Sequence, residues 1–109
     1  MNNTALAPTA STPDPRADSR ALFDLGQMVA TPGVLAHLQD HATTTPQELL
    51  RRHVLGDFGD LCTADRQANL DAIKRGDRVL SAYEVAGERI RVITEHDRSV
   101  TTVLLASEY

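Results

Sequence analysis

The hydrophobic pattern of this chain of 109 residues changes abruptly at Gly76, and the change restricts the folds that the chain can adopt. Before Gly76 the apolar residues recur at helical spacing, whereas after it they alternate with polar residues. The alternation predicts two strands, and a short apolar run rich in β-branched residues predicts a third. Two short turns join the three strands into an antiparallel meander. The strands cover residues 79–85, 90–94 and 100–105, and the turns cover residues 86–88 and 95–99.

Four helices are predicted ahead of the meander, each with a residue that can cap its first turn. The caps are Ser19, Thr31, Thr45 and Thr63. The apolar residues of the first helix are Leu22, Leu25, Met28 and Val29. Pro32 and Pro46 occupy the first position of the second and third helices, where proline is favoured, and Glu48 adds a capping box. The glycine-containing loop at residues 55–62 precedes the fourth helix, which ends at Gly76.

One domain accounts for most of the chain. Residues 1–19 contain several prolines and few aliphatic side chains, so they cannot bury enough apolar area to offset the entropy lost on ordering. We therefore expect a disordered tail over residues 1–19 and a single α+β domain over residues 20–109. In this domain the short N-terminal helices pack on the C-terminal three-stranded antiparallel meander, because a sheet of that size is marginally stable alone.

Composition sets limits on function and location. The chain has 11 Lys and Arg residues against 15 Asp and Glu residues, and 4% of its residues are aromatic. This balance disfavours a surface that binds nucleic acid throughout, and the shortage of aromatic side chains disfavours a base-stacking platform. The single cysteine, Cys62, excludes an internal disulfide and a zinc site built on cysteines. The sequence has neither an apolar run that could cross a membrane nor a secretory signal, so we expect a cytoplasmic protein.

The most concentrated group of polar residues lies in the second turn. Its members are Glu95, His96, Asp97, Arg98 and Ser99. A histidine beside two carboxylates can act as a general base, and an arginine can hold a phosphate or a carboxylate. Neighbours in a turn point in different directions, however, and Asp97 and Ser99 commonly bond to nearby backbone groups. We therefore interpret Glu95, Asp97 and Arg98 as surface recognition groups and assign no catalytic residue.

A second polar group consists of His53, Asp57 and Asp60, in and just before the loop at residues 55–62. Two carboxylates near one imidazole can hold a divalent cation loosely, but a loop of glycine and aspartate also turns the chain without any ligand. We predict no metal site and no cofactor, and we add Asp57 and Asp60 to the surface recognition groups. A pair of histidines at helical spacing elsewhere, four residues apart, is too small for a closed zinc site.

Two arginines stand out on the second predicted strand. Arg89 and Arg91 fall on the same face of that strand, opposite Ile90 and Val92. Together with Tyr83, or with its neighbours on the first strand, they could line a polar recognition surface on the outside of the sheet. The interpretation that we prefer is a solvated sheet face without a ligand.

Three stretches of the chain together resemble a known family. They are residues 23–33 (FDLGQMVATPG), residues 53–61 (HVLGDFGDL) and residues 92–105 (VITEHDRSVTTVLL), the last continuing to Tyr109. Over residues 20–109 the chain is similar to a family of small uncharacterised bacterial proteins found on plasmids and integrated elements. The resemblance implies a mobile-element setting and no established activity. Some members carry the label of a type I restriction subunit, which no methyltransferase or nuclease motif supports in this chain. Phe58, His96, and Ala106 with Ser107 depart from the family pattern.

Three kinds of function are compatible with these features. We prefer a small non-catalytic accessory protein that binds a protein partner, with a role in mobile-element maintenance or in modulation of host defence. The alternatives are a small toxin-like ribonuclease, suggested by the order of the elements and the polar turn, and a nucleic-acid-binding regulator that uses the third or fourth helix. An exposed edge of the meander also leaves room for a homodimer. The expected recognition groups are Asp57, Asp60, Glu95, Asp97 and Arg98.

Overall fold

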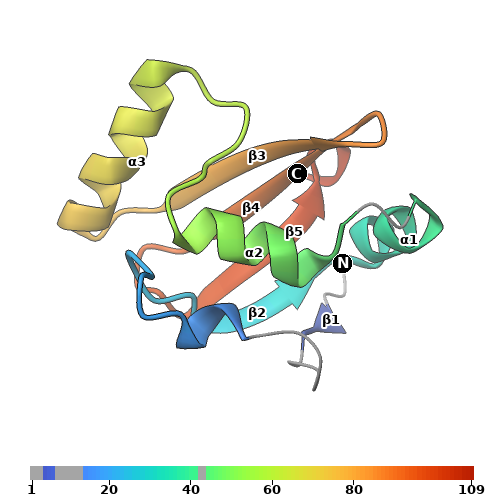
Figure 1. Cartoon of the computed structure of the whole chain (residues 1–109), viewed down its shortest axis with the longest axis horizontal. Coiled ribbons are helices and arrows are strands. Elements are labelled where there is room, and N and C mark those ends of the chain that lie inside the picture. Colours follow the sequence, from blue (N-terminus) through green and yellow to red (C-terminus); the bar gives the residue numbers. More distant parts are fainter. Residues whose placement is uncertain (1–3, 7–13, 42–43) are drawn as a thin grey trace.

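The computed structural model of the chain describes residues 4–6, 14–41 and 44–109. These residues form an α+β fold in which two helices pack across one side of a sheet (Figure 1). In chain order the elements are β1 (Thr4–Ala5), η1 (Pro15–Ala17), β2 (Gln27–Ala30), α1 (Pro32–His41), α2 (Pro46–Val54), α3 (Thr63–Arg75), β3 (Val79–Val85), β4 (Glu88–Thr94), β5 (Val100–Leu105) and η2 (Ala106–Glu108), where η denotes a 3-10 helix.

The sheet has five strands in the order β1-β2-β5-β4-β3. The predicted meander is confirmed, because β3, β4 and β5 pair antiparallel, with Val92 between Ser81 and Val103. The prediction of a three-stranded antiparallel sheet is wrong, because β2 pairs with β5 in parallel and β1 pairs with β2 antiparallel. The sheet is therefore mixed, and an N-terminal segment covers the edge that β5 would otherwise expose.

The helix predicted to follow Ser19 does not form. Residues 20–26 contain turns and bends, and β2 follows directly after them. Gly26 shows the physical reason, because it has a φ of +65° and a Cβ atom there would lie 2.4 Å from the carbonyl oxygen of Arg98. Only glycine lets the chain pass so close to the turn before β5. This passage brings Gln27 opposite Val100 and sets the parallel register of the two strands.

The tail expected over residues 1–19 lies partly outside the described residues, which omit 1–3 and 7–13. Within the described part of this segment the chain forms β1 and η1. Asp18, just after η1, lies 3.5 Å from the guanidinium group of Arg51 on α2. An ion pair therefore links this segment to the helix layer.

Most helix boundaries lie where the sequence predicts them. Thr31 Oγ1 and Thr45 Oγ1 each accept a hydrogen bond from the backbone N–H three residues later, at 3.2 and 3.1 Å, and so cap α1 and α2. The predicted cap of α3 by Thr63 is wrong, because Thr63 is the first helical residue and Cys62 precedes it without a side-chain bond. As predicted, α3 ends at Gly76.

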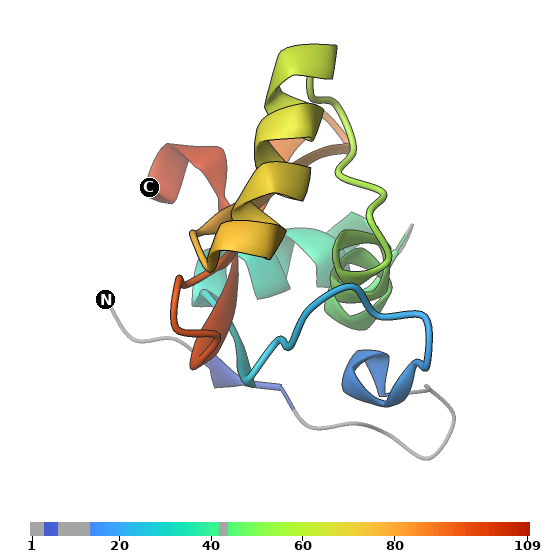
Figure 2. The same cartoon turned by 90° about the vertical axis from the view of Figure 1, so that its left-hand side faces the viewer.

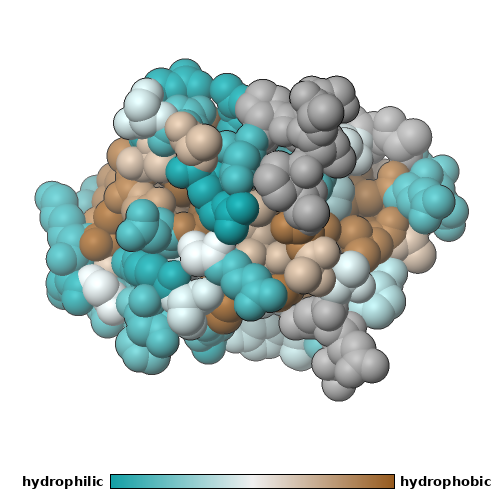
Figure 3. Space-filling model, turned by 90° about the horizontal axis from the view of Figure 1, so that it is seen from below, coloured by the Kyte–Doolittle hydropathy of each residue, from teal (hydrophilic) through white to brown (hydrophobic). Residues whose placement is uncertain are grey.

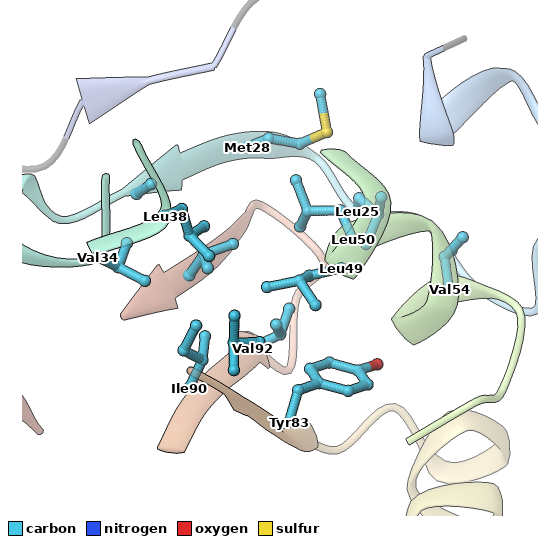
Figure 4. Close-up of a cluster of buried hydrophobic side chains, with 13 residues drawn as sticks. Leu25, Met28, Val34, Leu38, Leu49, Leu50, Val54, Tyr83, Ile90 and Val92 are labelled. Atoms are coloured by element: carbon cyan, nitrogen blue, oxygen red, sulfur yellow. The ribbon is translucent and has the colours of Figure 1, made fainter. Parts of the chain in front are cut away.

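The hydrophobic core lies between the sheet and the helices α1 and α2 (Figure 4). It takes side chains from both helices, from β2, from the segment before β2 and from the meander. The labelled members of the cluster are Leu25, Met28, Val34, Leu38, Leu49, Leu50, Val54, Tyr83, Ile90 and Val92. Seen from below, the surface of the molecule has hydrophobic areas interrupted by hydrophilic side chains (Figure 3).

The outer edge of β3 is covered by α3 and by the loop before it. The side chain of Asn69 accepts a hydrogen bond from the N–H of Leu80 at 3.1 Å and donates one to the Leu80 carbonyl at 2.7 Å. The backbone on either side of Gly59 pairs in the same way with the N–H and carbonyl of Ala82. A Cβ atom on Gly59 would lie 1.9 Å from the carbonyl oxygen of Ala82, so glycine is required for this approach.

Candidate interaction surface

Different elements pack on the two faces of the meander. The face that bears Tyr83, Ile90 and Val92 packs against α1 and α2. On the other face the chain places η2 and the C-terminal residue, while α3 stands at the edge of the sheet (Figure 2). We call this other face the second face. It consists of Leu80, Ala82, Glu84, Arg89, Arg91, Ile93, Thr102 and Leu104 on the strands, with the ion pair of Arg78 and Glu95 at one end.

The second face contains an apolar depression of about 300 Å³. Ile93 and Leu104 line its base and are themselves 5% and 8% exposed. Its wall includes Tyr109, which follows η2 and is 64% exposed. Glu108 holds η2 in place, because its Oε1 accepts hydrogen bonds from the N–H of Leu105 at 2.9 Å and from a threonine hydroxyl at the start of α1 at 2.7 Å. The position of Tyr109 is therefore tied to the fold.

Arg91 stands beside this depression without a charged partner. Its guanidinium carbon lies 5.4 Å from the centre of the Tyr109 ring, within the range of a cation–π contact. Its Nε atom is the one buried side-chain nitrogen or oxygen that lacks a hydrogen-bond partner among the described residues. The neighbouring Arg89 and Arg78 are paired, with carboxylate contacts at 3.3 and 3.1 Å. The second face therefore carries one guanidinium group whose charge is not compensated.

The three recognition residues predicted in the second turn lie together, and each makes contacts within the fold. Asp97 Oδ1 accepts hydrogen bonds from the N–H and hydroxyl of Ser99, at 3.0 and 2.6 Å, and the hydroxyl contact lowers the pKa of Asp97. Arg98 donates to carbonyl oxygens that include those of Asp77 at 2.6 Å and of Ala72, near the end of α3, at 3.3 Å. Glu95 forms the ion pair with Arg78 described above and lines the wall of the depression.

Asp57 and Asp60 belong to a different part of the molecule. Asp57 Oδ2 accepts a hydrogen bond from Arg52 at 2.7 Å, and this contact lowers the pKa of Asp57. The backbone N–H of Asp60 donates to the carbonyl of Ala82 at the outer edge of β3, and its side chain is exposed. No hydrogen bond or ion pair in the described part of the chain joins these two carboxylates to the turn at 95–99.

His53 lies at the centre of a buried polar network that the sequence analysis did not predict. Its ring nitrogens contact the hydroxyls of Ser81 at 2.5 Å and Thr94 at 2.9 Å. Thr94 in turn contacts Thr101, which donates to the carbonyl of Leu25 at 2.7 Å. Burial, with a smaller effect of a nearby arginine, lowers the pKa of His53 to about 3. The four side chains are fully buried, so the network stabilises the core and offers no group to a ligand.

Other sites in the described part of the chain are weaker candidates. A wider depression of about 760 Å³ lies between η1 and the segment before β2. Its charged groups are largely occupied, because Arg16 pairs with Asp14, Asp18 pairs with Arg20 and Arg98 binds carbonyl oxygens. The described residues contain no cluster of three or more potential metal ligands. Their helices also include none that is long and apolar enough to span a membrane.

The sequence located part of the second face. Arg89 and Arg91 share a face as predicted, and Glu84 stands opposite Arg89. Of the first-strand residues considered for this face, Tyr83 does not join the arginines, because it pairs with Ile90 and is buried on the helix-covered face, whereas its neighbours Ala82 and Glu84 pair with Arg91 and Arg89. The pairing of residues across the short turn between β3 and β4 decides which side chains of β3 share a face with Arg89 and Arg91. No local sequence signal indicated that Tyr109 would approach Arg91, since that contact depends on η2.

Comparisons of the chain with models of known protein families, with curated proteins and with solved structures give no match.

Proposed function

We propose that this chain is a non-catalytic interaction protein that binds a partner protein through the second face of its sheet. The observation that supports the proposal most directly is the apolar depression beside Tyr109, with the unpaired guanidinium group of Arg91 next to it. Aromatic side chains and arginines around an apolar centre are typical of protein interfaces. The Nε atom of Arg91 is buried, but the terminal N–H groups of its guanidinium make no hydrogen bond or ion pair among the described residues, so an incoming group can use them.

A nuclease or a nucleic-acid-binding regulator has less support from the same contacts. The imidazole of His53 is inaccessible, and the guanidinium group of Arg98 is occupied by backbone carbonyls. A nucleic acid on the second face would also meet the carboxylates of Glu84 and Glu95, which repel phosphate groups.

The family resemblance suggests the biological processes in which this binding takes place. A small accessory protein of a plasmid or integrated element acts by binding, and mobile-element maintenance or modulation of host defence are the processes in which we expect this binding to matter. A cytoplasmic location belongs to the same expectation.

Site-specific photo-crosslinking tests the proposal. A photoreactive residue replaces Thr102, which is half-buried on the second face, and a matched control carries it at Gln39, exposed on α1. In nuclease-treated extract of the native host we expect one protein to crosslink from position 102 and not from position 39. Crosslinks from position 39 alone, or none from either position, would contradict the proposal. Crosslinks to nucleic acid before nuclease treatment would favour the alternatives.

A further inference from the structure

The arginines of the second face differ in whether they have a carboxylate partner. Arg78 and Arg89 are neutralised by Glu95 and Glu84, at 3.1 and 3.3 Å, whereas Arg91 between them on the sheet has no ion pair among the described residues. Arg91 is therefore the arginine of this surface that lacks a carboxylate within ion-pair distance among the described residues, although the chain as a whole has a net charge of −4. A surface of this kind is complementary to a single carboxylate.

The surroundings of Arg91 favour a carboxylate with an apolar neighbour. Arg91 stands between Ala82 on β3 and Leu104 on β5, and neither side chain offers an acceptor. The ring of Tyr109 lies over its guanidinium group and limits the directions that the donors can take. A carboxylate can accept two parallel hydrogen bonds from such a group. An apolar side chain beside that carboxylate fits the depression that Ile93 and Leu104 line.

We propose that the second face binds an acidic and apolar segment of a partner protein, with one carboxylate on Arg91 and one apolar side chain in the depression next to Tyr109. This inference rests on the proposed function and specifies the chemistry of the partner. The segment binds by its side chains and not as an added strand at β3, because the backbone groups of Leu80 and Ala82 at that edge are already paired.

Two other occupants fit the same surface less well. A nucleic acid would bring many phosphates to a surface that holds one uncompensated arginine and two carboxylates, Glu84 and Glu95. A second copy of the chain, packed by two-fold symmetry, would present the same unpaired Arg91 from both sides, and the carboxylates that it brings, Glu84 and Glu95, are already paired with arginines. The partner segment must therefore differ from the second face itself.

Peptide titrations followed by two-dimensional amide NMR test this inference on the full chain. The probe is acetyl-Ser-Leu-Glu-Leu-Ser-amide, and the control peptide has glutamine in place of glutamate. The protein variants are Arg91→Gln, Arg91→Lys and Arg20→Gln, of which the last removes an arginine that lies outside the second face and has a carboxylate partner, Asp18. Amide spectra of each free variant establish that it is folded before the titration.

We expect saturable shifts centred on Arg91, Leu104 and Tyr109, with an affinity at least about tenfold lower for the glutamine peptide and for Arg91→Gln. Arg91→Lys keeps the charge without the planar pair of donors, so its affinity should fall between these values. Arg20→Gln should bind as the unaltered chain does. Preservation of the glutamate preference in Arg91→Gln would overturn the inference.

Three further results would also overturn the inference: equal binding of both peptides, shifts confined to another surface, or no saturable shift at peptide concentrations of about 5 mM. Stronger binding of oligo(dT) at the same residues, or self-association across the second face, would assign the surface to a different occupant. If the peptides fail while a partner still crosslinks from position 102, the chemistry assigned to the partner is wrong and the proposed function stands.

Discussion

His53 is fully buried, and its surroundings determine its protonation state. Each ring nitrogen contacts a hydroxyl group, and burial lowers the pKa of the imidazole from 6.5 to about 3. The folded protein therefore holds a neutral histidine in conditions where the unfolded chain would bind a proton. The cost of this difference depends on pH and can be measured.

We expect acid to destabilise the fold through His53. Above pH 6.5 both states are neutral and His53 makes no contribution to pH dependence, but between pH 6.5 and about 3 only the unfolded state takes up the proton. The free energy of unfolding should therefore decrease by about 1 kcal/mol for each pH unit in this range. Urea unfolding at a series of pH values measures the slope, and His96→Gln, which removes an exposed histidine, should retain it. A free energy that stays constant as the pH falls from about 6.5 to about 4.5 would contradict this assignment.

Gly59 is a second residue whose role can be tested in isolation. It has a φ of +75°, and a Cβ atom there would lie 1.9 Å from the carbonyl oxygen of Ala82. Gly87 has a similar φ of +84° but nothing within 4 Å of its Cβ position. Alanine at position 87 should cost about 1 kcal/mol of stability, from backbone strain alone, whereas alanine at position 59 should cost about 3 kcal/mol or more because the backbone must also move.

Urea unfolding of Gly59→Ala and Gly87→Ala measures this difference. Because both variants share the same change of side chain and a similar backbone conformation, the difference between them reports the contact with Ala82. Equal losses in the two variants would mean that the loop does not press against β3 as described.

At the scale of elements, α3 packs against the start of β3 through a small apolar cluster and also binds the strand edge through one polar side chain. Within α3 only Asn69 and Ala72 are buried, so the helix adds little to the main core. The amide of Asn69 instead completes both edge hydrogen bonds of Leu80, at 3.1 and 2.7 Å. A free strand edge is a site of unwanted pairing, and this contact removes part of it.

Asn69→Ala should therefore release the edge of β3. We expect a loss of about 1 to 2 kcal/mol, because the N–H and carbonyl of Leu80 lose their partners. Amide hydrogen exchange should become faster at Leu80 than in the unaltered chain, while Val92 in the centre of the sheet should follow only the change in global stability. Gln67→Ala, which removes an exposed contact on the same helix, is the matched control. Unchanged exchange at Leu80 in Asn69→Ala would show that the side-chain bonds do not protect this edge.

The elements that sequence reasoning predicted are those with local signals. Strands β3 and β4 follow from the alternation of apolar and polar residues after Gly76, and β5 follows from a short apolar run rich in β-branched residues. Helices α1 and α2 follow from a threonine cap before a proline. Strand β2 has no comparable signal, because it is short, buried for most of its length and stabilised by parallel pairing with a strand about 70 residues later. Its apolar spacing also fits a helix, which explains the incorrect prediction.

The candidate surface also has a part that local sequence predicts and a part that depends on distant contacts. Alternation along β4 predicts that Arg89 and Arg91 share a face, and the structure confirms it. The depression beside them depends on Tyr109, whose position is set by η2 and by Glu108 reaching the start of α1. Contacts between residues that are far apart in the sequence leave no pattern within a short stretch of it. The buried bonds of His53 were missed for the same reason.

At the scale of the whole molecule, the two faces of the sheet have different roles. Helices α1 and α2 cover the face that builds the core, with Val92 and Val103 fully buried there. The second face is covered by side chains and by η2, and this lighter cover leaves a depression with an uncompensated arginine. In the proposed function, recognition takes place on the side of the sheet opposite the main core, so exposed residues of the second face can be replaced without removing that core.

The outer edge of β3 bears on whether the chain pairs with itself. The sequence analysis allowed a homodimer through an exposed edge of the meander, but the backbone groups of Leu80 and Ala82 are occupied by Asn69 and by the loop around Gly59. We therefore expect no dimer through this edge in the unaltered chain at about 0.1 mM, as measured by light scattering coupled to size exclusion. In Asn69→Ala the freed groups of Leu80 become available, and any self-association should increase with protein concentration relative to Gln67→Ala. A dimer of the unaltered chain that dissociates when Leu80 is replaced by proline, in a variant that remains folded, would contradict this expectation and identify the β3 edge as the interface.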